Sequence, residues 1–325
     1  MSRRVPALAA AAAIGSLVAG QVAVPRWSGF HTWEYAAALA VLMWLLASYA
    51  RAARTGRDGD VGAWLSVPVI GACIVGAAGL IDGLLGPDSD LVQRAPGSVA
   101  VVPDVRAAAF FPPADAADIE RGDVGITLRR RDGASLQLAP ASRAYVGATA
   151  LEAIPRVAAY VEATDGAGER LTVTQPTNPA FLSPVALFST LVPIAGRQVP
   201  ADSFALPARH RALKVFYFAA GSIPGLQAHG FDGAPLVLFA VDDDRGALIP
   251  GGIAAAPSGR FVTVGGLRLR ATLGTYPALA VSSIPPPVLL WLGGVVFFGG
   301  LLYARVATTR AARAPARAGG TLCIG

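Results

Sequence analysis

The chain has 325 residues, of which 54% are hydrophobic and 15% are charged, and this composition excludes an ordinary soluble protein and indicates a membrane protein. Lysine and arginine number 27 against 21 acidic residues, but residues 87–284 hold 17 of each sign, so the whole positive surplus lies in the flanking segments. A basic nucleic-acid-binding domain is therefore excluded, and the expected contact of the flanks is the lipid bilayer.

Four segments are apolar enough and long enough to cross a bilayer as helices, which takes about 20 residues. They cover residues 5–24, 31–50, 62–85 and 285–305. Small residues near Ala19 and Gly20 leave a second interpretation open for the first segment, namely a signal peptide that is cleaved. The expected fold class is a membrane protein with three N-terminal transmembrane helices, a β-rich extracytoplasmic domain over residues 87–284, and one C-terminal helix.

Basic residues gather in the short segments on one side of these predicted helices. They are Arg3, Arg4, Arg51, Arg54, Arg57, Arg305, Arg310, Arg313 and Arg317. Because short arginine-bearing segments resist transfer across the membrane, we expect both termini and the basic tail, residues 306–325, to lie in the cytoplasm. Residues 87–284 are then outside. The predicted location is the bacterial cytoplasmic (inner) membrane, crossed four times.

Small residues line one face of the third predicted helix, at Ala72, Gly76, Gly79 and Gly83. Their spacing of four, three and four residues keeps them on one face, where they permit close helix contact. We expect this face to pack against the chain's own helices, and a dimer interface is the alternative. Gly293 and Gly300, one heptad apart in the last segment, are candidates to receive such a contact.

The region outside the membrane is predicted to be rich in β-strands, at residues 98–102, 123–129, 156–163, 169–174, 213–219, 235–241, 260–264 and 267–273. These segments are short, rich in Val, Leu, Phe and Thr, and separated by turn sequences such as Asp165-Gly166 and Asp232-Gly233. No good amphipathic helix separates them, so the pattern favours an antiparallel sandwich or an open barrel.

Two further segments of this region each allow two interpretations. Residues 181–196 are apolar but interrupted by Pro184 and Pro193, which favours core or a loop on the membrane surface over a ligand-contacting wall. The run Asp242-Asp243-Asp244 could hold a hard cation, but its position before Arg245-Gly246 favours a solvated turn.

Candidates for chemistry are few. The GxSxG, HExxH, P-loop and dinucleotide-binding motifs are missing, so no catalytic residue and no metal site are predicted. Arg209, His210 and Arg211 could meet carboxylates such as haem propionates, or ligate iron, but a charged loop leading into a buried strand is the favoured interpretation. His31 lies at the outer mouth of the second span, where Asp82 reaches a similar depth, and ionisable residues at membrane depth are often functional. At an interface snorkelling or hydration removes most of the cost of such a residue, and this is the favoured interpretation over a ligand or proton role for His31.

Three stretches of the chain carry a family resemblance. They are Phe30-His31-Thr32-Trp33-Glu34-Tyr35, then the glycine-rich end of the third span with the later run Gly97-Ser98-Val99, and Ser282-Ser283-Ile284-Pro285 before a Leu/Gly-rich helix. These stretches, and the order of three spans, an external domain and a final span, resemble the ResB (also called CcsB) proteins of cytochrome c maturation.

The resemblance implies a membrane subunit that supports haem delivery and apocytochrome c presentation outside the membrane, together with a CcsA-like partner protein. Such a subunit is an accessory part of a cytochrome c synthase and performs no covalent chemistry of its own. Haem would be the cofactor, with His31 as the first candidate for haem contact and Arg209 and Arg211 as candidates for its propionates. The alternative function is a membrane-anchored extracytoplasmic sensing or assembly scaffold unrelated to haem.

Overall fold

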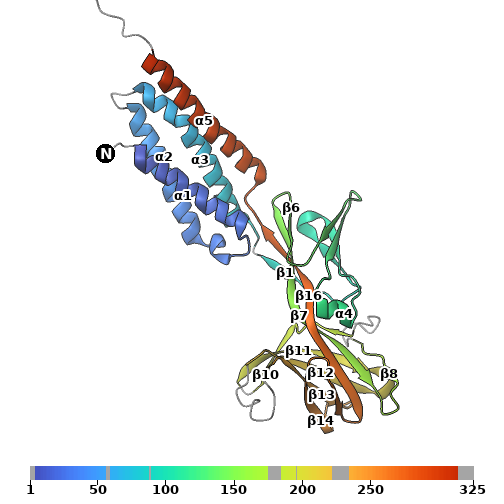
Figure 1. Ribbon diagram of the computed structural model, residues 1–325. Helices are drawn as coiled ribbons and strands as arrows, with labels where there is room; N and C mark the ends of the chain where they lie inside the picture. Colours follow the sequence, from blue (N-terminus) through green and yellow to red (C-terminus); the bar gives the residue numbers. More distant parts are fainter. Residues whose placement is uncertain are drawn as a thin grey trace, which may run out of the picture. The chain divides into compact units, whose positions relative to one another are not determined.

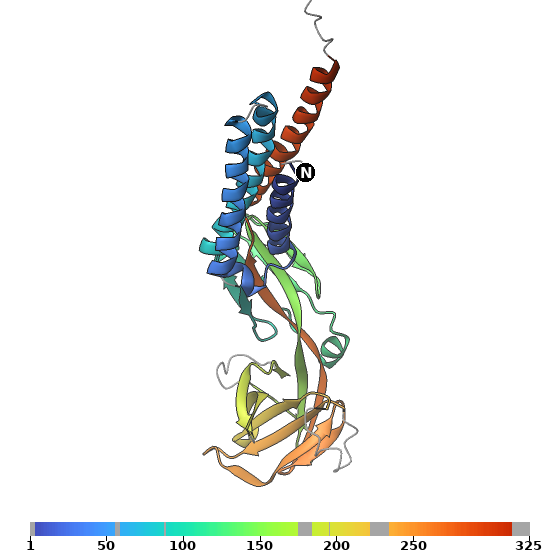
Figure 2. The same cartoon turned by 90° about the vertical axis from the view of Figure 1, so that its left-hand side faces the viewer.

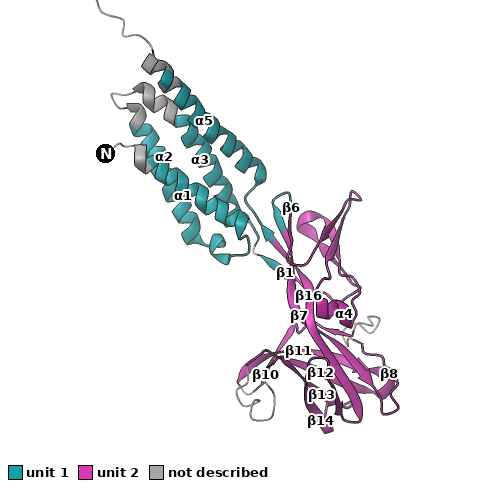
Figure 3. Cartoon of the chain, viewed as in Figure 1, with its two compact units in different colours: residues 1–90, 145–150, 282–325 teal, residues 91–144, 151–281 magenta. Residues whose placement is uncertain are grey.

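The computed structural model describes residues 4–55, 59–87, 89–174, 184–194, 196–221 and 234–313. The chain divides into two compact units (Figure 3). The helical unit comprises residues 1–90, 145–150 and 282–325, and the β-rich unit comprises residues 91–144 and 151–281.

Four long apolar helices make up most of the helical unit (Figure 1). They are α1 (Arg4–Ala23), α2 (Trp33–Thr55), α3 (Gly59–Leu85) and α5 (Pro287–Arg313), and the 3₁₀ turn η1 (Ser28–His31) precedes α2. Within α2, α3 and α5 the stretches Trp33–Ala52, Ser66–Leu85 and Pro287–Val306 are long and apolar enough to cross a membrane, and α1 contributes the shorter apolar stretch Ala7–Ala23.

The predicted helix limits differ from the observed ones at several ends, since α2 ends at Thr55 rather than at residue 50 and α3 begins at Gly59 rather than at residue 62. Residue His31 does not begin the second helix but ends η1, because the Thr32 hydroxyl accepts a hydrogen bond from the Tyr35 backbone N–H at 3.3 Å and thereby caps α2. Helix α5 continues past Arg305 to Arg313.

Helix α3 is the centre of the helical unit, since it contacts α1, α2 and α5. The glycines of the predicted small-residue face allow α1, α2 and η1 to approach it closely. A Cβ at Gly76 would lie 2.8 Å from the Met43 sulfur, and a Cβ at Gly83 would lie 2.8 Å from the Phe30 carbonyl oxygen. Ala72, on the same face, is buried in the core that these helices share.

A different part of α3 receives α5. A Cβ at Gly293 would lie 2.9 Å from the Gly71 carbonyl oxygen, and a Cβ at Gly300 would lie 2.7 Å from the ring of Pro68. Gly293 and Gly300 therefore allow close contact between the backbones of α3 and α5. Their partners on α3 are Gly71 and Pro68, and not the predicted small-residue face at Gly76, Gly79 and Gly83.

Three antiparallel sheets contain the described strands. The first sheet has the order β1-β16-β7-β6. In addition, β15 pairs with β16, and both β8 and β9 pair with β7. Its strands are β1 (Asp90–Val92), β6 (Arg143–Val146), β7 (Thr149–Thr164), β8 (Arg170–Leu171), β9 (Val185–Ala186), β15 (Phe261–Val264) and β16 (Leu267–Ser283). The second runs β10-β11-β12-β13-β14, with β10 (Thr190–Ile194), β11 (Arg197–Leu206), β12 (Arg211–Phe218), β13 (Leu236–Asp242) and β14 (Leu248–Pro257). The third runs β2-β3-β4-β5, with β2 (Val99–Val102), β3 (Ala107–Phe110), β4 (Ile126–Arg130) and β5 (Ser135–Leu138).

The main core of the β-rich unit lies between the first two sheets. Val161 of β7 and Leu269 of β16 pack in one cluster with Phe204 of β11, Val215 of β12 and Phe239 of β13, all fully buried. Strands β7 and β16 are unusually long, at 16 and 17 residues, and cross the unit as a pair (Figure 2). The predicted β-rich character of residues 87–284 is therefore confirmed, and two of the sheets share one core.

One short α-helix, α4 (Ala116–Arg121), lies among the described residues of the β-rich unit. In the chain it connects β3 and β4 of the third sheet. Asp115 and Asp118 cap its first turn reciprocally, and a Cβ at Gly274 of β16 would collide with the Ile119 carbonyl oxygen. On the same strand the Tyr276 hydroxyl donates to the Pro112 carbonyl oxygen at 2.6 Å, and burial raises the pKa of Tyr276. This helix has no counterpart in the sequence-based expectation.

Candidate polar site in the helical unit

Five polar side chains meet in the helical unit where α1 ends and α2 begins. They come from five different elements: Gln21 of α1, His31 of η1, Tyr35 of α2, Asp82 of α3 and Ser283 at the end of β16. Gln21 is 1% exposed and Asp82 is 4% exposed, while Tyr35 and Ser283 are also buried. We name these five residues the polar cluster.

The Gln21 amide connects two parts of α3. Its Nε2 donates to the Gly79 carbonyl oxygen at 3.2 Å and to the Asp82 carboxylate at 3.4 Å. Both partners are acceptors, so the amide nitrogen must face them and the amide oxygen must face away. Gly79 makes this position possible, because a Cβ there would lie 2.9 Å from the Gln21 Oε1.

Ser283 joins the cluster to both chain segments that connect the helices with the strands. Its hydroxyl hydrogen-bonds to the Asp82 carboxylate and lies 3.2 Å from the Pro87 carbonyl oxygen, so its single proton is given to one of these two acceptors. Gly86 leaves the necessary room, since a Cβ there would lie 2.5 Å from the Ser283 Oγ and 2.7 Å from the Asp82 Oδ1.

Three atoms of the polar cluster are buried without a hydrogen-bond partner among the described residues: Gln21 Oε1, His31 Nδ1 and the Tyr35 hydroxyl oxygen. Each such atom costs about 1–3 kcal/mol relative to a satisfied one, so three together are unusual. His31 also interacts electrostatically with Asp82. The His31 Nδ1 and the Tyr35 hydroxyl could bind a polar group beside the Asp82 carboxylate, and the imidazole nitrogen could instead ligate a metal.

The predicted basic candidates lie in the β-rich unit, and two of them have partners there. The Arg209 guanidinium donates to Asp165 at 2.6 Å, and the Arg211 guanidinium donates to the Gly265 carbonyl oxygen at 2.5 Å. His210 follows the turn η3 (Pro207–Arg209) with a positive φ of 49°. The structure thus places His31 in one unit and Arg209, His210 and Arg211 in the other.

The aspartate run has a structural explanation in the fold. Asp242 forms an ion pair with Lys214 at 2.7 Å, and the Asp243 carboxylate accepts from the Arg245 and Ala247 backbone N–H groups at 3.0 and 2.8 Å. Over the described residues no group of three or more His, Cys, Asp or Glu side chains is arranged to hold a metal ion. The contacts of Asp243 are those of a turn.

The apolar segment 181–196 divides into parts with different surroundings. Val185, Ala186, Leu187 and Phe188 are buried, which places them in the core, whereas Leu191 on β10 is exposed. Residues 181–183 and 195 lie outside the described residues.

Sequence reasoning did not identify Gln21 or Tyr35 as candidate site residues. A usable signal existed for the first, because Gln21 is the one glutamine within the apolar segment 5–24. The amide of a glutamine is costly to bury without partners, so its presence in such a segment indicates a hydrogen-bonded contact. Tyr35 and Ser283 gave no comparable signal.

The residues fit the haem that the resemblance implies only in part. His31 has a buried, unpartnered Nδ1 that could ligate iron, but the two arginines expected at the propionates are already bonded to Asp165 and Gly265. No family model matches the chain, and no curated protein and no solved structure is significantly similar to it. Evidence on function therefore comes from the chain's own residues.

Proposed function

We propose that the chain is a multi-pass membrane protein whose helices anchor a β-rich scaffold or sensing domain outside the cytoplasm. The observation that carries this proposal is the polar cluster. Its hydrogen bonds join α1 and α3 to Pro87 and Ser283, the residues at which the chain leaves α3 and approaches α5. These contacts hold both chain segments that lead from the helices toward the β-rich unit.

The surface of the helices supports insertion into a bilayer. Large apolar side chains point outward, including Trp44, Trp291 and Phe298, which are 67%, 77% and 70% exposed. A water-soluble protein rarely exposes an apolar surface of this extent, whereas lipid solvates it well. The Arg-bearing ends of the helices would then lie in the cytoplasm and the β-rich unit on the other side.

Labelling from outside the cell tests this topology. With both native cysteines replaced by serine, Ala134→Cys in the β-rich unit is expected to react with a membrane-impermeant maleimide on intact cells. The matched variant Ala52→Cys, near the end of α2, is expected to react only after the membrane is opened. Labelling of residue 134 only in opened cells, or extraction of the chain by alkaline carbonate, would overturn the proposal.

A test of attachment uses the Asp82 carboxylate. Asp82→Ala removes the acceptor shared by Gln21 and Ser283, and we expect the connections at Pro87 and Ser283 to become sensitive to protease while the cores of both units stay resistant. The control is Glu34→Ala at the exposed start of α2. Equal protease patterns for the two variants would contradict the role given to the polar cluster.

The second candidate function is the ResB-like one, and the unpartnered His31 Nδ1 favours it. In this proposal the chain supports haem delivery and apocytochrome c presentation with a CcsA-like membrane protein, and His31 would hold haem, which when bound supplies the group attached to the cytochrome. Purified chain, alone and with that partner, is then expected to show a Soret band that His31→Ala removes and Phe30→Leu leaves in place. No Soret band in either preparation would exclude this function and leave the scaffold proposal standing.

A further inference from the structure

Three arginines and one glutamate lie on the face of the first sheet that points away from the core. Arg170 comes from β8, Glu162 from β7, and Arg268 and Arg270 from β16. Their neighbours along each strand pack against the core, so by alternation these four side chains point outward. We name this surface the arginine face.

Positive charge exceeds negative charge on the arginine face. Arg270 forms an ion pair with Glu162, and the Arg170 guanidinium lies 3.5 Å from the same carboxylate. The Arg170 guanidinium also donates to the Tyr160 hydroxyl at 2.8 Å. Three positive charges against one negative charge leave a local surplus of two positive charges.

The strand register gathers these charges in one area. Thr164 of β7 is paired with Arg170, and its hydroxyl donates to the Arg268 carbonyl oxygen at 3.2 Å. Arg170 and Arg268 are therefore two strand spacings apart, which is about 10 Å. Arg268 and Arg270 are alternate residues of β16, about 7 Å apart along the strand.

The Arg268 guanidinium is held in place without a carboxylate. Its Cζ atom lies 4.2 Å from the centre of the Phe261 ring, and the Arg270 Cζ atom lies 4.7 Å from the same centre. Within the part of the chain that the structure describes, the Arg268 guanidinium has no hydrogen-bond or ion-pair partner. Contact with the ring restricts this exposed side chain and leaves its N–H groups available to an anion.

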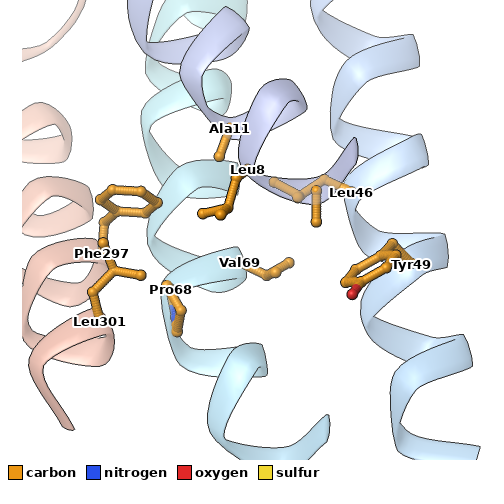
Figure 4. Close-up of a pocket in the computed structure, with 9 residues that line it drawn as sticks. Leu8, Ala11, Leu46, Tyr49, Pro68, Val69, Phe297 and Leu301 are labelled. Atoms are coloured by element: carbon orange, nitrogen blue, oxygen red, sulfur yellow. The ribbon is translucent and has the colours of Figure 1, made fainter. Parts of the chain in front are cut away.

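The groove among the four helices gives no comparable indication of an occupant. Its walls are apolar apart from the Tyr49 hydroxyl, and they include Leu8, Leu46 and Phe297 (Figure 4). Nothing in the structure distinguishes one apolar occupant of that groove from another. The arginine face, in contrast, specifies the charge of what binds it.

We infer that the arginine face binds an acidic, extended segment of a partner protein. Alternate side chains of an extended peptide lie on one side about 7 Å apart, which matches the spacing of Arg268 and Arg270. Each guanidinium can bind a carboxylate through two parallel N–H groups. A nucleic acid fits less well, because residues 87–284 as a whole hold 17 basic and 17 acidic residues and offer no extended basic surface.

This inference rests on the proposed scaffold or sensing function and names the surface that receives the partner. Peptide binding is measured on the purified chain, whereas topology is measured by labelling intact cells, so the two can fail separately. A chain with the proposed topology that binds no acidic peptide defeats only the inference. A β-rich unit labelled only in opened cells defeats the proposed function, whatever peptide it binds.

Fluorescence polarisation tests the inference on the full chain in a neutral detergent. The probe is a fluorescein-labelled octaglutamate peptide, and the control is an octaglutamine peptide of the same length. We expect only octaglutamate to bind, and Arg268→Gln to weaken its binding about fivefold. Arg129→Gln, at an exposed position on β4, should leave the affinity unchanged. Equal binding of the two peptides, or equal weakening by the two variants, would overturn the inference.

A variant of the glutamate is expected to act in the opposite direction. Glu162→Gln removes the carboxylate beside Arg170 and Arg270, so the affinity for octaglutamate should rise about fivefold. An unchanged or lower affinity of the folded variant would overturn the inference, and if this variant does not fold, Arg268→Gln still decides the question. Tighter binding of an oligothymidylate than of octaglutamate would assign the face to a nucleic acid and overturn the inference as well.

Discussion

The two units treat buried polar groups in opposite ways. In the β-rich unit several charged groups are paired with charges of the other sign, as in Arg270 with Glu162, Lys214 with Asp242 and Arg209 with Asp165. In the helical unit the buried carboxylate of Asp82 has an amide and a hydroxyl as hydrogen-bond partners, and three neighbouring polar atoms have none among the described residues. Ion pairs of the first kind satisfy the buried charges within the fold, whereas the unpartnered atoms of the helical unit leave room for a partner such as an ordered water or a bound polar group.

Packing differs between the units as well. The β-rich unit fills its core with large side chains such as Phe204 and Phe239, while the helical unit obtains close contact through glycines such as Gly71 and Gly293. Four variants, taken from the largest expected effect to the smallest, test both differences.

The largest effect is expected in the filled core. Phe239 is fully buried between the two sheets, so Phe239→Ala should lower the free energy of unfolding by about 3–5 kcal/mol. Chemical denaturation followed by circular dichroism measures the loss. Phe110→Ala, at a partly exposed position on β3, is the control and should cost far less; similar losses for both would mean that the core lies elsewhere.

The next effect concerns glycine contact between helices. Gly71→Val should cost about 1–3 kcal/mol, because a Cβ at Gly71 would lie 2.7 Å from the Gly293 carbonyl oxygen and the helices must separate. Gly294→Val is the matched control, since nothing lies within 4 Å of a Cβ at that position. Thermal unfolding in detergent should separate the two variants, and equal melting temperatures would disprove the close contact of α3 with α5.

A smaller effect is expected inside the polar cluster. Gln21→Leu removes hydrogen bonds to Gly79 and Asp82 but also removes the unpartnered Oε1, and the two contributions of about 1 kcal/mol each oppose one another. We therefore expect a change below about 1 kcal/mol in the free energy of unfolding. A loss of several kcal/mol would show that the cluster is a stabilising element like the ion pairs of the β-rich unit.

The smallest effect is a change with pH in the β-rich unit. The Glu169 backbone N–H, with the Arg209 guanidinium and the Ala167 N–H, holds the pKa of Asp165 below its ordinary value despite burial. Its contribution to stability is therefore complete above the unfolded pKa near 4 and is lost as the pH falls through the lower folded pKa. Asp165→Asn should flatten the pH dependence of the melting temperature in this acidic range only; a difference in slope at neutral pH would contradict the assignment.

The sequence predicted the helices well because apolar runs bounded by arginine have few alternatives. Its error at the start of α2 came from counting apolar residues, although Thr32 is a preferred N-cap residue and accepts a hydrogen bond from the Tyr35 backbone N–H. Apolar counting likewise ended the last helix at Arg305, where the apolar run stops, whereas the described helix continues to Arg313.

The strands were predicted less completely, and the missing ones share a physical reason. Strand β3 reads Ala-Ala-Ala-Phe, β11 contains Pro200, and β14 contains adjacent glycines, so local preference speaks against each. The other strands that were not predicted are β1, β5, β6, β9 and β10. These segments form strands because they pair with strands distant in the chain, and the local sequence does not indicate such pairing.

The candidate site depends even more on distant contacts. His31 and Asp82 were expected at similar depth and lie in one cluster. Gln21 and Ser283 are 262 residues apart in the chain. Their place in the polar cluster could be predicted only from knowing how α1 and the end of β16 contact α3. The guanidinium groups of Arg209 and Arg211 suit an anionic ligand, but in the structure they bind Asp165 and Gly265. These partners follow β7 and β15, which are distant in the chain, so residue spacing could not predict the two contacts.

The glycines of α3 also limit how the chain can change in length. Gly71 contacts α5, whereas Gly76, Gly79 and Gly83 contact α1, α2 and η1. Both sets of helix contacts therefore depend on how α3 is rotated about its own axis. Inserting or deleting one residue between Gly71 and Gly76 would rotate one set of glycines by about 100° relative to the other. The two sets could then not contact their partner helices at the same time. Natural length variation should therefore spare α3 and accumulate in solvent-facing turns such as the one at Asp132 and Gly133.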